Sequence, residues 1–130
     1  TLELLRKVKP GVESSLSWQS DHDLHQSERF GQLISSIHEA VKKVLEFLKI
    51  ADTPFVMTGL WANMNAPDAI HKMHNHPNNL LSGVYYLQTG KGADTINFHD
   101  PRPQRDVIKP PVAELTADNT DQVVVTVSDG

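Results

Sequence analysis

The spacing of apolar residues changes once along this chain, and the change constrains the fold more than any other feature. From about residue 27 to residue 49, apolar residues recur every three or four positions, which predicts an amphipathic helix. Ser27 can cap its start, and Glu28 suits the positive end of its dipole. After Pro54 the apolar residues fall in short runs typical of strands. One helix followed by short strands predicts a mainly β domain, an antiparallel sandwich or barrel with the helix packed on a sheet.

Several segments are expected to form these strands. They are residues 55–64, 70–76, 80–88, 95–99, 112–115 and 122–127. Residues 80–88 are the strongest candidate, because they are rich in β-branched and aromatic side chains. Loops are expected at the mostly polar residues 14–23 and at residues 101–111, which hold four prolines. We expect a single domain over residues 1–130, with a helical region at 1–50 and the first part of a barrel at 51–130.

Composition and charge exclude several classes of protein. The 130 residues include no cysteine, so disulfide bonds and thiolate metal sites are excluded. The net charge is −4 without a dense basic patch, which argues against nucleic-acid binding. No apolar run approaches the roughly 20 residues of a membrane span, and no signal-peptide pattern is present, so a cytoplasmic location is expected. The start at Thr1 and the end at Gly130, just after a strand-like run, predict a fragment with strand partners downstream.

Residues 71–76 hold three of the seven histidines. If the segment is extended, His74 and His76 lie on one face, where two neutral imidazoles can hold a transition metal. His71 adds little, because positions three apart do not share a strand face. Two histidines separated by one residue are a weak motif by themselves, so a polar turn with surface imidazoles stays open.

Polar side chains near this cluster are candidates for ligand contacts. Asn63 follows Trp61 at the end of an expected strand, and amides in such places either form turns or line pockets. In residues 80–88 one strand face carries both Ser82 and Tyr86, although a core tyrosine with a satisfied hydroxyl is the ordinary alternative. Arg102 can pair with an anionic ligand or remain a solvated loop residue.

Four short motifs together resemble one family. They are WAN from residue 61, HNHPN from residue 74, LSGVYYL from residue 81 and FHDPR from residue 98. This combination resembles the 2-oxoglutarate-Fe(II) oxygenases of an uncharacterised double-stranded β-helix family from marine bacteria and their phages. The resemblance runs from about residue 15 to the end of the chain.

The resemblance implies a jelly-roll, cupin-like barrel that binds Fe(II) and 2-oxoglutarate. His74 matches the first metal ligand, and His76 stands where related oxygenases have a carboxylate. Tyr86 resembles the tyrosine that contacts the far carboxylate of 2-oxoglutarate. We assign Asn63 and Ser82 to the same co-substrate site. The family pattern places a third histidine and an anchoring arginine beyond Gly130.

The predicted function is therefore a dioxygenase that couples 2-oxoglutarate decarboxylation to hydroxylation of a substrate that the sequence does not identify. One alternative is a non-catalytic jelly roll with a structural or binding role, for example in a virion or in contact with carbohydrate. Another is a cupin-like protein that binds zinc or nickel. A homo-oligomer is compatible with all three, and neither a nucleic acid nor a membrane is an expected partner.

Overall fold

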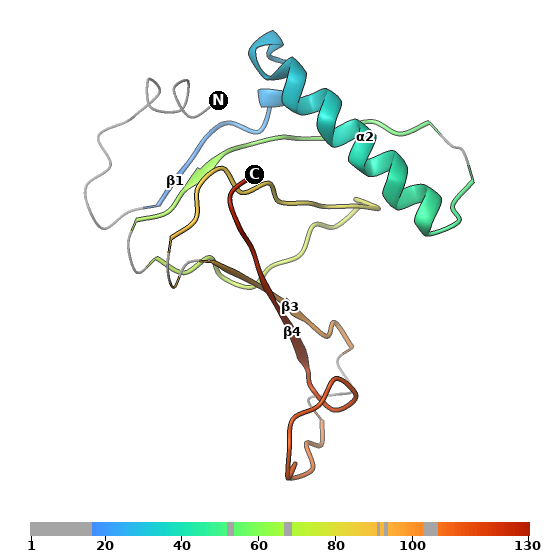
Figure 1. Ribbon diagram of the computed structural model, residues 1–130, viewed down its shortest axis with the longest axis vertical. Helices are drawn as coiled ribbons and strands as arrows, with labels where there is room; N and C mark the ends of the chain where they lie inside the picture. The colour runs from blue at the N-terminus through green and yellow to red at the C-terminus, as the bar shows by residue number, and fades with distance from the viewer. Residues whose placement is uncertain (1–16, 52–53, 67–68, 91, 93, 103–106) are drawn as a thin grey trace. The chain divides into compact units, whose positions relative to one another are not determined.

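The computed structural model describes residues 17–51, 54–66, 69–90, 92, 94–102 and 107–130 (Figure 1). The chain divides into two compact units, Thr1–Ser82 and Gly83–Gly130, and each is described by itself. The described residues form one α-helix, two short 3-10 helices and four short antiparallel strands. The fold is therefore mixed, with a single helix and small sheets.

The predicted helix is confirmed over most of its length as α2, Gly31–Phe47 (Figure 1). Two 3-10 helices precede it, η1 at Leu24–Gln26 and η2 at Glu28–Phe30. Ser27 is the N-cap of η2, but its side chain makes no capping hydrogen bond, so the predicted role of its hydroxyl is wrong. One stripe of α2 is half-buried, as its periodicity requires.

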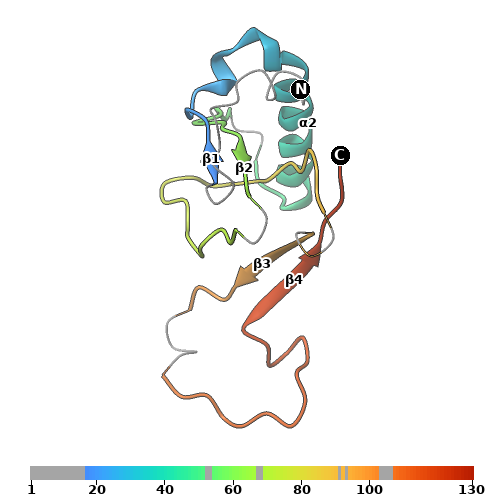
Figure 2. The ribbon, with the colours of Figure 1, turned by 90° about the vertical axis from the view of Figure 1, so that its left-hand side faces the viewer.

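Two segments of the first unit lie side by side although they are far apart in sequence. Strand β1, Trp18–Gln19, pairs antiparallel with β2, Asn63–Met64 (Figure 2). Three residues beyond this ladder, the Leu60 N–H donates to the His22 carbonyl at 3.0 Å. The expected loop at residues 14–23 is thus wrong at β1, and residues 14–16 lie outside the described part. The expected strand at residues 55–64 is confirmed only at its end.

The second unit contains the longer ladder. Strand β3, Thr95–His99, pairs antiparallel with β4, Gln122–Thr126, and Phe98 faces Val123 across it (Figure 2). The pairing continues at the open end of the ladder, away from the loop that joins the strands, where the Val127 N–H donates to the Asp94 carbonyl at 2.8 Å. The predictions for residues 95–99 and 122–127 are therefore confirmed to within one residue.

Three expected strands are not formed: residues 70–76, 80–88 and 112–115. A strand exists only where its backbone groups pair with a neighbour, and propensity alone provides no neighbour. In residues 80–88 the Tyr86 carbonyl accepts a single backbone hydrogen bond, from Gly130 at 2.9 Å. The described strands make two separate two-stranded sheets, so the jelly roll remains a prediction.

The described residues do not form a closed core. None of their large side chains is fully buried, and the apolar side chains of β4 are largely exposed. No helix among them combines the length and the apolar character that crossing a bilayer requires.

Candidate metal centre

The histidine cluster lies in an irregular segment of the first unit, after β2. The ring centroids of His74 and His76 are 4.9 Å apart, with the ring planes at 81°. Two imidazoles bound to one ion, each through a nitrogen about 2.1 Å from it and at an angle of about 90–110°, have centroids about 4.6–5.3 Å apart. The spacing of His74 and His76 is therefore compatible with two ligands of a single ion, and it is also the ordinary spacing of two rings packed edge to face.

One hydrogen bond indicates which tautomer the neutral His74 ring adopts. Its Nδ1 lies 2.8 Å from the Lys72 carbonyl oxygen, which only accepts hydrogen bonds. Nδ1 therefore carries the proton, and in the neutral ring Nε2 keeps its lone pair. Metal-binding histidines are commonly oriented in this way by a carbonyl behind the ring. His74 is thus prepared to bind an ion through Nε2.

His71 lies as close to His74 as His76 does, which sequence reasoning missed. Its ring centroid is 4.8 Å from that of His74. Positions three apart diverge on a strand, but this segment is not a strand, so His71 and His74 come together. Within the described part of the chain, however, no three histidine or acidic side chains form a metal-binding group. His74 therefore has two neighbouring imidazoles, and the described residues bring together no full set of metal ligands.

The surroundings of His76 are aromatic. Its ring lies 5.7 Å from that of Trp61, and Trp61 stacks on His22 at 4.5 Å with an interplanar angle of 23°. After His76 the chain turns through Pro77 and Asn78, and Asn78 has the positive φ of 67° that asparagine tolerates. His22 was not among the predicted residues, because no local pattern links it to a cluster so distant in sequence.

A shallow polar hollow of about 250 Å³ borders the cluster at His71. Its lining residues are Ser17, Trp18, Gln19, Asn63, Asn65, Ile70, His71 and Lys72. One lysine and no acidic side chain line it, so among the described residues its charge is positive. Asn63, a predicted co-substrate contact, lies here at the start of β2.

The other two predicted co-substrate residues lie in different units. Ser82 is exposed in the first unit, and Tyr86 is half-buried in the second. Because residues 80–88 do not form a strand, alternation along a strand no longer places the two side chains on one face. Their assignment to a co-substrate site remains a prediction.

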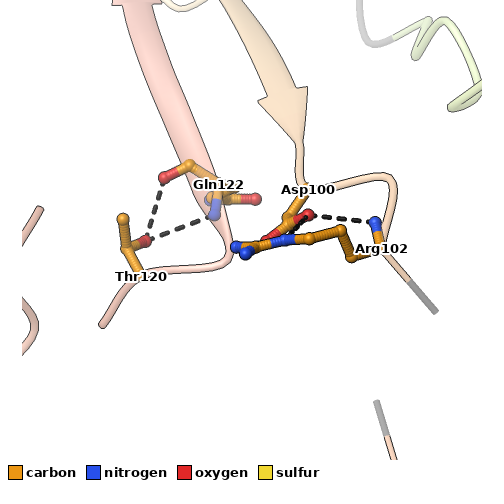
Figure 3. Close-up of polar contacts among 4 residues, drawn as sticks. All are labelled: Asp100, Arg102, Thr120 and Gln122. Atoms are coloured by element: carbon orange, nitrogen blue, oxygen red, sulfur yellow. Dashed lines mark hydrogen bonds and ion pairs between the residues drawn. The ribbon is translucent and has the colours of Figure 1, made fainter. Parts of the chain in front are cut away.

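Arg102 is engaged within its own loop (Figure 3). Its Nε donates to Asp100 at 2.9 Å, its Nη2 donates to the same carboxylate, and its backbone N–H does so at 2.9 Å. This carboxylate raises the pKa of Arg102 further above its usual value. Beside it, the Thr120 hydroxyl bonds the backbone of Gln122 at the start of β4 (Figure 3). The guanidinium therefore fixes the turn after β3 instead of facing a free anion.

A pair of imidazoles, exposed at His74 and half-buried at His76, has a spacing compatible with two ligands of one ion and makes the chain a candidate histidine-type metal protein. Residues 59–130 match the family described as "Putative 2OG-Fe(II) oxygenase", and because the match spans more than half of the chain, the chain belongs to this family. The suspected family is thereby confirmed, while the resemblance before residue 59 lies outside the match. No curated protein and no solved structure matches the chain.

Proposed function

We propose that this protein is an Fe(II)- and 2-oxoglutarate-dependent oxygenase in which His74 and His76 bind the metal. The 4.9 Å spacing of their rings, inside the segment that matches the family, is the observation that supports it most. If Fe(II) and 2-oxoglutarate bind here, dioxygen would be the oxidant for hydroxylation of a C–H bond. The metal would activate it, and oxidative decarboxylation of 2-oxoglutarate would supply the two electrons that the C–H bond does not, which is chemistry that protein side chains lack. We also propose the jelly-roll fold, on the strength of family membership.

The residues of this chain have the tasks of binding and orientation. His74 offers Nε2 to the ion because the Lys72 carbonyl holds its Nδ1–H. Two neutral imidazoles leave the charge of the ion uncompensated, which favours an anionic co-substrate. Tyr86 donates its hydroxyl to the far carboxylate of 2-oxoglutarate, and Asn63 and Ser82 contribute further polar contacts. Iron sites of this class use three protein ligands, so the proposal includes a third from elsewhere in the protein.

The test is ligand binding under anaerobic conditions with the full-length protein. Fe(II) and 2-oxoglutarate together are expected to give a weak visible charge-transfer band. His74→Ala and His76→Ala should abolish it, and the control His25→Ala should keep it. No band with the unaltered protein at saturating concentrations, or an unchanged band in His74→Ala, would overturn the proposal.

A metal protein without oxygen chemistry is favoured by one observation. The donors that the described residues bring together are imidazoles alone, and imidazole also suits zinc, nickel and copper. Elemental analysis of the purified protein separates the two functions. Iron supports the oxygenase, zinc or nickel supports the alternative, and a protein that retains no metal supports a non-catalytic scaffold.

A further inference from the structure

Trp61 contacts two imidazoles, one of which is a proposed metal ligand. Its ring stacks on His22 at 4.5 Å and meets His76 at 5.7 Å. We infer that His22 and Trp61 are positioning residues that hold the His76 ring in the orientation needed for metal binding. This inference rests on the proposed metal site and adds to it two residues that do not bind the ion themselves.

His76 needs such support because nothing else in the described residues fixes its ring. His74 is held by a hydrogen bond to the Lys72 carbonyl. His76 makes no hydrogen bond to any other described residue, and its ring contacts are with Trp61 and His74. A ligand ring that rotates freely loses orientational freedom when it binds an ion, which lowers the affinity. The Trp61 contact removes part of that freedom before the ion arrives.

The backbone on both sides of Trp61 is fixed to the segment that carries His22. Before it, the Leu60 N–H donates to the His22 carbonyl at 3.0 Å. After it, the Ala62 N–H donates to the Ser20 hydroxyl at 2.9 Å. These bonds hold the Trp61 backbone beside the segment that carries His22.

Gly59 is part of the same arrangement. A Cβ added at Gly59 would lie 3.4 Å from the His22 carbonyl oxygen and 3.6 Å from the Trp61 ring. These are ordinary van der Waals distances, so residue 59 lies against both the indole and the His22 backbone, and a methyl group would also fit there. His22 is further held at its edge, where its Nε2 lies 2.6 Å from the Gln19 amide nitrogen. The stack is therefore built by residues that lie far from His76 in sequence.

Co²⁺ is a suitable probe, because its visible absorption reports the geometry of its ligands as well as their number. In the full chain, Trp61→Ala is expected to weaken Co²⁺ binding about tenfold or more and to change the absorption band, as loss of a ligand-orienting group does. His22→Ala should act in the same direction with a smaller effect. His22→Phe should restore affinity and band, because a flat ring still stacks on the indole. His25→Ala, three residues away, is the matched control and should bind as the unaltered protein does.

Fluorescence gives a readout that does not involve the metal. The chain has two tryptophans, so Trp18→Phe leaves Trp61 as the single reporter. In that background His22→Ala should lower the fluorescence anisotropy of Trp61, and His22→Phe should restore it. Circular dichroism of each variant verifies that the chain is still folded.

The outcomes separate this inference from the proposed function. Normal Co²⁺ affinity and an unchanged band in both His22→Ala and Trp61→Ala, with binding lost in His76→Ala, would refute the positioning role and leave the metal site intact. A His22→Phe variant as weak as His22→Ala would show that an imidazole nitrogen matters, and would overturn the stacking argument. No Co²⁺ binding by the unaltered chain would overturn both.

Discussion

His71 and His76 are equally close to His74 but differ in what surrounds them. His71 is exposed beside the polar hollow, whereas His76 is half-buried against Trp61. A ligand held in place before binding loses less freedom than a mobile one. At the scale of single residues, the structure therefore favours His76 as the partner of His74.

This difference predicts unequal effects of two alanine substitutions. His76→Ala should weaken Co²⁺ or Ni²⁺ binding by more than about 100-fold, because loss of a ligand exceeds the effect of losing an orienting group. His71→Ala should weaken it less than tenfold or so, through lost contact with His74. Isothermal titration of both variants measures this directly. A larger loss in His71→Ala would move the site to the other histidine pair.

The hydrogen bonds of Asp129 predict that the stability of the second unit depends on pH. Its Oδ1 accepts hydrogen bonds from the Thr89 backbone N–H at 2.6 Å and from the Thr89 hydroxyl at 2.8 Å. These donors, the hydroxyl first, lower the pKa of Asp129 below its usual 3.8. Because the folded pKa is the lower one, the stabilisation is complete above the unfolded pKa and is lost as pH falls through the folded value.

Asp129→Asn should therefore be less stable than the unaltered chain at pH 6–7, and the difference should shrink as the pH falls below about 4. Thermal unfolding followed by circular dichroism over this range is the measurement. Thr89→Ala keeps the backbone donor and removes the hydroxyl, so its stability is expected to lie between those of Asp129→Asn and the unaltered chain. A difference that stays constant with pH would show that the charge of Asp129 does not contribute.

Two backbone hydrogen bonds satisfy the last carbonyl groups of helix α2. The Ile50 N–H donates to the Leu45 carbonyl at 3.0 Å, and the Lys49 N–H donates to the Glu46 carbonyl at 3.1 Å. This is the Schellman arrangement, in which the residue after the helix has a left-handed backbone and is usually glycine. Here Lys49 is the residue in this left-handed position, with φ of 55°. For a residue other than glycine, this backbone conformation lowers the stability of the folded chain by about 1–2 kcal/mol.

Lys49→Gly is thus expected to stabilise the chain, by about 0.5–1 kcal/mol after the greater flexibility of glycine in the unfolded chain is subtracted. Lys43→Gly, inside α2, is the matched control and should destabilise by about 1 kcal/mol. Urea unfolding measures both. Destabilisation by Lys49→Gly would show that the lysine side chain contributes more than its backbone conformation costs.

At the scale of the whole molecule, the apolar side chains that the second unit leaves exposed should govern how the chain behaves in solution. Phe98 is 56% exposed and Val124 is 53% exposed, on a ladder of two strands. Two-stranded sheets with open edges and apolar faces tend to pair with other chains. We expect the chain to associate as its concentration rises.

Val124→Lys should reduce this association, because it removes apolar surface and adds charge on β4. Thr126→Lys adds the same charge two residues further along the same strand face and leaves Val124 in place. Sedimentation velocity over a range of concentrations should show a larger reduction for Val124→Lys. Equal effects would indicate that charge alone opposes association, and no association of the unaltered chain would contradict the expectation.

The parts of the fold that follow from local sequence were predicted well. Helix α2 was identified from its own periodicity, and β3 and β4 from apolar runs bounded by breakers such as Pro101. Residues 80–88 have equal strand propensity, yet they form no ladder. A strand depends on a partner, and the sequence of the strand does not say whether the partner is in place.

The sequence by itself determined the family and predicted the histidine pair, because both depend on short motifs. Only the tertiary structure decided that Trp61 joins His22 to His76, whereas the contacts of His74 with His71 and with the Lys72 carbonyl are local and follow from the irregular conformation of residues 71–76. The reason is the range of the interactions. Periodicity and motifs depend on neighbours along the chain, whereas the surroundings of a ligand depend on segments that the backbone brings together from far apart.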